Sequence, residues 1–176
     1  MSIRSATSTL GLATVAVALT GAGITYAGAA APAPDKALLH EIRAATARYH
    51  SPSQAERDGY VKDSPCESSP AGGMGFHYIN ISRILDPKID PTEPEVLLYA
   101  PSPSGGVELV GVEYLKFDAD GSLLTTDDRP FLGTVPFDGP MPGHTAQMPV
   151  HYDLHVWLYQ RNPSGTFAPW NPHVTC

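Results

Sequence analysis

The chain has 176 residues, with 18 acidic and 11 basic side chains and a formal net charge of −7. No cluster of Lys and Arg is present, and phosphate binding needs such a cluster. Nucleic acid and an anionic membrane surface are therefore excluded as partners, and a small-molecule ligand is the partner class left open. The length suffices for one domain with its own core, and the oligomeric state stays open.

The first residues have the features of a secretory signal peptide. Arg4 is the only charged residue before Asp35, and a long apolar run ends at the small residues Ala27-Gly28-Ala29. This pattern predicts a signal peptide over 1–29 and a mature domain over 30–176. A membrane anchor is the alternative, although glycines and threonines dilute the run. We expect a secreted or cell-envelope protein, outside the cytoplasmic membrane and free of it after cleavage.

The two cysteines, Cys66 and Cys176, are expected to pair. An exported protein meets an oxidising compartment, where a disulfide forms and persists. Two free thiols are the alternative. Neither cysteine belongs to a C-x-x-C motif, so a redox centre is not indicated.

Residues 35–60 are predicted to be a helical arm. Asp35 is a good N-cap, and apolar residues recur at helical spacing over 36–50. Ser51 and Gln54 have the spacing of a capping box, which predicts a second short helix that ends before Gly59.

Residues 74–176 are predicted to be a β-rich core. Strands are expected at 76–81, 95–100, 107–117 and 150–160, and 131–149 is expected to be an irregular loop rich in proline and glycine. Strands joined by turns without helices between them imply an antiparallel sheet. We therefore expect an α+β fold, with two short N-terminal helices packed on an antiparallel β-sandwich or small β-barrel.

The segment MPVHYDLHVWLYQ, residues 148–160, alternates between apolar and polar side chains. A period of two is typical of a strand with one face on a core. The core face is expected to hold Tyr152, Leu154, Val156 and Leu158. The opposite face is expected to hold His151, Asp153, His155, Trp157 and Tyr159.

This opposite face is the best candidate for a metal site. His151 and His155 would meet His77 and Glu113 from neighbouring strands. Imidazole and carboxylate ligands suit a divalent transition metal such as Zn, Cu, Fe or Mn. Glu113 is expected to share a face with Leu109, Leu115 and Phe117, and a carboxylate among apolar residues needs a partner.

Other residues near this face have alternative roles. Asp153 could be a further ligand or an acceptor that fixes a histidine tautomer. Met141, His144, Met148 and His151 have the ligand types of a copper site, although the spacing is not specific. No G-x-S-x-G motif or other nucleophile is evident, so no catalytic residue is assigned and an enzymatic role stays open.

Two interpretations without a metal are alternatives to the metal site. The histidines could simply form a polar strand face on which each ring is satisfied by a neighbour. Tyr78, Trp157 and Tyr159 could instead line an aromatic pocket, in which case the protein would be a metal-free extracellular module that binds a sugar or another small molecule. Asp118, Asp120 and the residues around them fit a turn better than a calcium loop.

Several segments carry a resemblance to a known family. GGMGFHYIN, PEVLLYAP, LVGVEY, MPGH, HYDLHVWLY and WNP, with the closing Cys, resemble a family of uncharacterised exported bacterial proteins. The resemblance covers most of the mature chain and implies export and a single domain. It implies no activity, because none is established for the family. The histidine motif of cupin barrels is absent, so that comparison is a fold-level analogy only.

Overall fold

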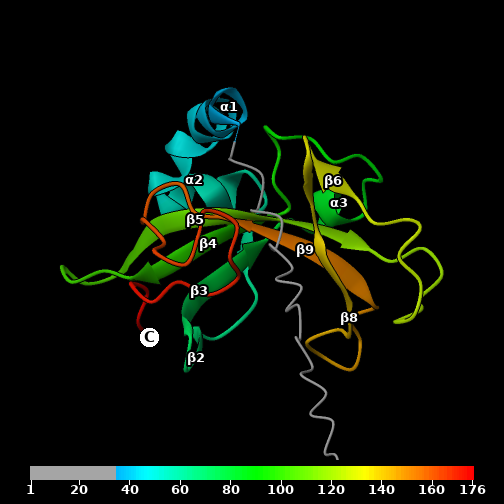
Figure 1. The fold of residues 1–176 in the computed structure, drawn as a ribbon. Helices are drawn as coiled ribbons and strands as arrows, with labels where there is room; N and C mark the ends of the chain where they lie inside the picture. Colours follow the sequence, from blue (N-terminus) through cyan, green and yellow to red (C-terminus); the bar gives the residue numbers. More distant parts are fainter. Residues whose placement is uncertain (1–34) are drawn as a thin grey trace, which may run out of the picture. The chain divides into compact units, whose positions relative to one another are not determined.

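The computed structural model describes residues 35–176 (Figure 1), so the predicted signal peptide over 1–29 lies outside the described residues. The described residues belong to one compact unit. None of their helices combines the length and the apolar composition that a membrane crossing requires.

The helical arm consists of α1 (Lys36–Thr46), the 3-10 helix η1 (Ala47–His50) and α2 (Pro52–Arg57). Asp35 caps α1 as predicted, because its side chain accepts a hydrogen bond from the backbone N–H of Ala37 at 2.8 Å. The helix predicted over 36–50 is thus present, but its last turn tightens into the 3-10 form.

The predicted capping box does not form. The Ser51 hydroxyl makes no cap hydrogen bond and instead lies 3.0 Å from the Ser53 hydroxyl. The Gln54 side chain donates to Asp58 rather than reaching back to the start of α2. Proline at the first position of α2 already supplies the helical backbone angle, so the helix starts without the box.

Seven strands form one antiparallel sheet in the order β1-β3-β4-β5-β9-β8, with β2 also paired to β3. Their bounds are β1 (Val61–Lys62), β2 (Glu67–Ser69), β3 (Gly72–Ile79), β4 (Val96–Pro101), β5 (Val107–Phe117), β8 (Asp138–Met141) and β9 (His151–Val156). The α+β class and the antiparallel sheet are confirmed. Among residues 35–176 the only other sheet is the ribbon of β6 (Phe131–Leu132) and β7 (Val135–Pro136), and the main sheet remains open, so no closed barrel forms there.

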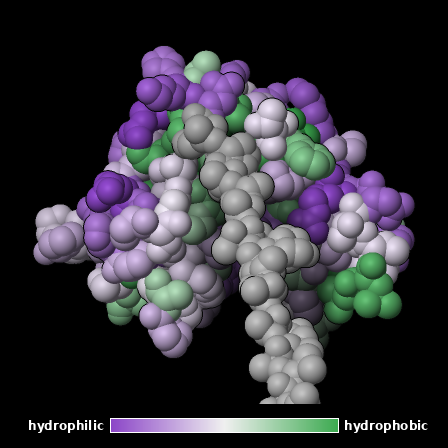
Figure 2. Space-filling model, viewed as in Figure 1, coloured by the Kyte–Doolittle hydropathy of each residue, from purple (hydrophilic) through white to green (hydrophobic). Residues whose placement is uncertain are grey.

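The two faces of the sheet have different partners. In Figure 1, α1 and α2 lie on one side of the sheet, and the loop after β8 lies on the other. The helix side holds Tyr152, Leu154 and Val156 in a core that includes Ile42 of α1. The Tyr99 hydroxyl donates to the Tyr49 carbonyl at 2.5 Å and links the sheet to the arm. Figure 2 shows mainly hydrophilic residues over α1, as expected for an amphipathic helix.

A β-bulge in β5 changes which side chains accompany Glu113. Leu98 of β4 pairs with Gly111, whereas the next residue, Tyr99, pairs with Leu109, so Val110 is the extra residue. The bulge moves Leu109 to the core on the helix side. The prediction that Leu109 and Glu113 share a face was therefore wrong. Alternation resumes after the bulge, so Leu115 and Phe117 remain on the face of Glu113.

The predicted strand boundaries fail at three places. The strand over 76–81 ends at Ile79, because Asn80 caps the helical turn α3 (Ile81–Ile84). The expected loop over 131–149 contains the edge strand β8, which pairs with β9. The strand predicted over 150–160 ends at Val156.

The end of the chain is fixed to the sheet. The predicted disulfide between Cys66 and Cys176 is present, with the two Cα atoms 5.6 Å apart. Gly73 of β3 forms a bridge with Asn171, and a Cβ at Gly73 would lie only 2.7 Å from the Val174 carbonyl oxygen. Glycine at this position therefore lets the tail approach the strand closely.

Candidate metal centre

Three strands bring His77, Glu113 and His155 together on the face opposite the helices. His77 lies on β3, Glu113 lies on β5, and His155 lies directly opposite Glu113 on β9. The His77 Nε2 atom is 3.3 Å from Glu113 Oε2, and the His155 Nε2 atom is 3.9 Å from the same oxygen. Each residue offers one donor atom within 4.8 Å of the other two, which is a spacing that could hold a metal ion.

His151, the fourth predicted ligand, belongs to a second group. It lies with His144 and Asp153, and their donor atoms are again within 4.8 Å of one another. The reason is strand geometry, since two residues four positions apart on a strand are separated by about 13 Å. His151 and His155 share a face but do not reach one ion, so the predicted four-residue site divides into two groups of three.

Both groups contain buried polar atoms that lack hydrogen-bond partners. Among residues 35–176, seven buried side-chain nitrogen or oxygen atoms have none, and six of them belong to these two groups. The six are His77 Nε2, Glu113 Oε2, His151 Nε2, Asp153 Oδ1 and both ring nitrogens of His155. Each such atom costs about 1–3 kcal/mol when it stays unpaired, so their concentration in one place is a feature expected of a site for a cation or for ordered water.

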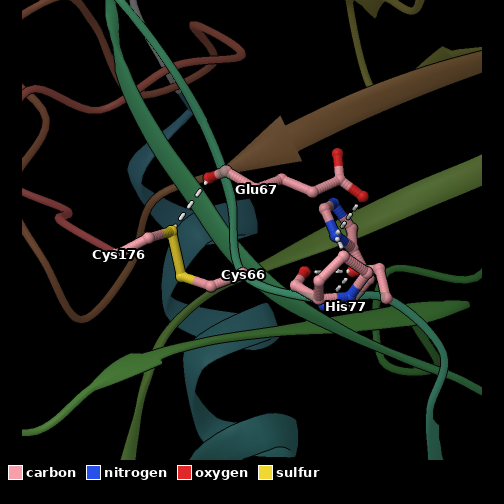
Figure 3. The surroundings of a disulfide bond; sticks show 6 residues. Cys66, Glu67, His77 and Cys176 are labelled. Atoms are coloured by element: carbon pink, nitrogen blue, oxygen red, sulfur yellow. Dashed lines mark hydrogen bonds and ion pairs between the residues drawn. A yellow bond between two sulfur atoms is a disulfide. The ribbon is translucent and has the colours of Figure 1, made fainter.

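The surroundings of His77 fix its tautomer. The Ser64 hydroxyl donates to the Pro65 carbonyl at 2.9 Å, and its oxygen lies 3.1 Å from His77 Nδ1. The Glu67 carboxylate is also near, with Oε1 at 3.6 Å from Nδ1 (Figure 3). Both oxygens act as acceptors here, so Nδ1 carries the hydrogen and the Nε2 lone pair faces Glu113. A metal-binding histidine needs this arrangement.

Burial disfavours the charged forms of the residues in both groups. Desolvation lowers the pKa of His155 to about 3 and also lowers the pKa of His77. Desolvation raises the pKa of Glu113 well above its ordinary value, and it raises the pKa of Asp153 to about 7. A bound cation would favour the ionised carboxylate and the neutral imidazoles, which are the forms that bind a metal.

The centre opens onto a pocket of about 590 Å³. Its lining contains His77 and Glu113, together with residues from the segments 63–67 and 144–149. Apolar side chains make up much of the remaining lining, namely Ile79, Ile81, Ile84, Val96, Leu115, Phe117 and Met148. A small molecule in this pocket would lie next to His77 and Glu113.

The three aromatic residues of the predicted pocket do not converge. Tyr78 and Tyr159 contribute to the core on the helix side, whereas Trp157 belongs to the cluster on the opposite face. The Trp157 indole donates to the Ala168 carbonyl at 2.6 Å, and its ring stacks on His155 with the centroids 6.3 Å apart. Tyr159 was assigned to the histidine face, but β9 ends before it, and its hydroxyl donates to the Arg43 carbonyl.

The two methionines of the alternative copper set are placed differently. Met148 lines the pocket, and Met141 on the edge strand β8 is the cross-strand partner of His151. His144 joins the second group, while Asp153 lies in that group with Oδ1 only 3.9 Å from His155 Nδ1. Asp153 can therefore act as a ligand or as a partner of His155, as the sequence suggested.

Sequence reasoning did not find Ser64 and Glu67. The two residues lie on either side of Cys66 in the sequence, and Glu67 directly follows it (Figure 3). The disulfide at Cys66 and the pairing of β2 with β3 hold this segment against β3. This adjacency was the only signal in the sequence, and it shows nothing about the distance to His77.

Comparisons with protein-family models, curated proteins and solved structures returned no match for this chain. The chemistry of the centre is therefore read from its donor atoms. Two imidazoles and one carboxylate are a ligand set that proteins use for Zn and for Fe(II), and three protein ligands leave coordination positions for water or a substrate.

Proposed function

We propose that this protein is an exported protein that binds a divalent transition metal through His77, Glu113 and His155. One observation carries the proposal: unpaired, buried donor atoms from three separate strands face one another. A cation between them would satisfy these atoms and compensate for the cost of burying them.

The ligand set narrows the choice of metal. It contains no thiolate, since both cysteines are in the disulfide, and Zn or Fe(II) suits two imidazoles with one carboxylate better than Mg or Ca does. A metal here would bind a water molecule or a substrate at the positions that the protein leaves open, next to the pocket of about 590 Å³. The centre would thus combine a metal, open coordination positions and an adjacent pocket, which a metal-dependent catalyst requires. Metal binding is the property to test first.

Export is the second part of the proposal. The signal-like residues before Ala30 motivate it, and the disulfide between Cys66 and Cys176 agrees with an oxidising compartment. A secreted or cell-envelope location would also give the centre access to metal outside the cytoplasm.

Metal titration of the Glu113→Gln variant tests the proposal. The amide keeps the size of the side chain but loses the negative charge, so the affinity of this centre for Zn²⁺ should fall at least about 100-fold, beyond what loss of an outer partner costs. Competition with a chromophoric chelator measures the affinity. Glu95→Gln is the matched control, because Glu95 is another buried carboxyl but lies outside both groups, and it should bind as the wild type does. Unchanged binding in Glu113→Gln would show that the proposal is wrong.

The apolar lining of the pocket supports a second candidate function, a metal-free module for small apolar molecules. A fluorescent apolar probe, 1-anilinonaphthalene-8-sulfonate, separates the two. If the protein binds no metal but binds the probe, and Phe117→Ala weakens that binding, the module is the better description. Binding of the probe that requires bound metal would favour the metal protein.

A further inference from the structure

The group of His144, His151 and Asp153 is built like the first centre but from different elements. His151 and Asp153 are alternate residues of β9, so both side chains project from the face that carries His155. His144 comes from the loop between β8 and β9, and its ring centroid is 5.0 Å from that of His151. Two imidazoles and a carboxylate again converge, within 4.8 Å.

His151 presents a free lone pair to this group. Its Nδ1 atom is 3.3 Å from the Pro149 carbonyl oxygen, which can only accept, so Nδ1 carries the hydrogen. The other nitrogen, Nε2, is then unprotonated, buried and without a partner. The residue is fully buried, and a lone pair held in this way is what a metal ligand requires.

A tight turn in the loop between β8 and β9 places His144 next to His151 of β9. A Cβ atom at Gly143 would lie only 1.9 Å from the Met148 carbonyl oxygen, so the loop closes on itself at a position that only glycine allows. The Met148 N–H donates to the Thr145 carbonyl at 3.2 Å and holds the same turn. His144 itself is exposed and lines the pocket.

His155 stands between the two groups. Its Nε2 atom faces Glu113, and its Nδ1 atom faces Asp153, each at 3.9 Å from the carboxylate oxygen. Neither nitrogen has a hydrogen-bond partner. One imidazole thus contacts both groups, and the pocket is lined by His77 and Glu113 of the first group and by His144 of the second.

We propose that His144, His151 and Asp153 form a second site for a divalent transition metal, beside the first centre and separated from it by His155. The observations that support this second site concern His144, His151 and Asp153 alone. Only the binding of two metals side by side rests on the function proposed above. Imidazole and carboxylate ligands suit Zn, Cu, Fe and Mn. A metal in each site would place one cation on either side of the His155 ring.

Metal stoichiometry in four proteins tests the second site. After equilibrium dialysis against excess Zn²⁺, mass spectrometry of the metal content should give about two equivalents in the wild type and about one in His144→Ala. Because His144 is exposed, this variant is expected to fold, which circular dichroism checks. Glu113→Gln should also retain about one equivalent, and His173→Ala, another exposed histidine, should retain about two.

The outcomes separate the two proposals. One equivalent that is unchanged by His144→Ala but lost in Glu113→Gln overturns the second site and leaves the first. One equivalent that is lost in His144→Ala but kept in Glu113→Gln supports the second site and overturns the first. A wild type without bound Zn²⁺ overturns both.

Chemical labelling gives a readout independent of stoichiometry. Diethyl pyrocarbonate should modify the exposed ring of His144 in metal-free protein, and saturating Zn²⁺ should reduce the labelling rate at least about 10-fold, because the coordinated nitrogen is no longer nucleophilic. His173 serves as the internal control, with an unchanged rate. Equal labelling of His144 with and without Zn²⁺ contradicts the second site.

Discussion

At the scale of single residues, oxygen atoms next to one histidine ring in each group determine which ring nitrogen carries the hydrogen. Ser64 and Glu67 direct the hydrogen of His77 to Nδ1, and the Pro149 carbonyl does the same for His151. The ring nitrogens that remain free then face carboxyl groups. Burial raises the pKa of Glu113 and of Asp153 and so favours their protonated forms, and a metal ion would compete with protons for these oxygens.

The raised pKa of Asp153 predicts a pH-dependent stability of the metal-free protein. Burial raises this pKa from 3.8 to about 7, so between these values the folded state holds a proton that the unfolded state has lost. The contribution of Asp153 to stability is full below about pH 4 and is lost as the pH rises through about 7. Asp153→Asn cannot titrate, so the wild type should lose stability relative to this variant over that window.

Urea denaturation in the presence of a chelator, at intervals from pH 4 to pH 8, measures this difference. His155 acts in the opposite direction, because its pKa is lowered to about 3 and its contribution is lost as the pH falls below about 6.5. Asp153 Oδ1 lies only 3.9 Å from His155 Nδ1, so the two contributions are coupled, and the pH dependence of Asp153→Asn by itself shows the part that belongs to His155. A constant difference across the range would mean that Asp153 is ionised in the folded protein.

At the scale of elements, two local irregularities shape the candidate sites. The bulge at Val110 lets β5 place Leu109 in the core on the helix side while Glu113 stays on the opposite face. The turn between β8 and β9 places His144 above β9. Bulges and irregular loops near a site commonly re-aim side chains in this way.

The Gly143→Ala substitution tests the role of the β8–β9 turn. The new methyl group cannot fit at 1.9 Å from the Met148 carbonyl oxygen, so the turn must open and move His144. Affinity of the second site for Zn²⁺ should fall about 10-fold or more, as it does when ligand geometry is disturbed, while the first centre is unchanged. Competition titration measures both affinities.

Ala146→Ser is the matched control, since it changes an exposed residue of the same loop without adding a backbone clash. It should bind as the wild type does. If Gly143→Ala also binds as the wild type does, the turn has no part in holding His144.

At the scale of the whole molecule, the disulfide connects the last residue to the segment next to the first centre. It closes a loop with a sequence separation of 110 residues and holds β2 beside β3, with Glu67 near His77. A link over so long a loop restricts the unfolded chain strongly. The same bond therefore stabilises the fold and keeps an outer partner of His77 in place.

Reduction of the disulfide should destabilise the protein. The chain-entropy estimate for a loop of this length is about 4–5 kcal/mol, so thermal unfolding with reductant should show a melting temperature lower by at least about 10 °C. Cys66→Ser and Cys176→Ser should each reproduce the shift without reductant and should show no further shift when reductant is added. An unchanged melting temperature in all of these would show that the bond contributes no stability.

The sequence alone determined the features that depend on neighbours in the chain. The period of two over 151–156 assigned both faces of β9, Asp35 marked the start of α1, and the cysteine count with the predicted export signal predicted the disulfide. It also singled out the histidines and acids that converge in the two groups, because polar residues in apolar strands need partners.

Only the tertiary structure decided how those residues group. Strand spacing separates His151 from His155, the order of strands brings His77 to Glu113, and the disulfide brings Glu67 to His77. A residue pattern shows on which face of its own strand a side chain lies. A metal site depends instead on the distances between side chains of strands that are far apart in the chain. Those distances are set by register, a bulge and loop closure, which a single sequence does not reveal.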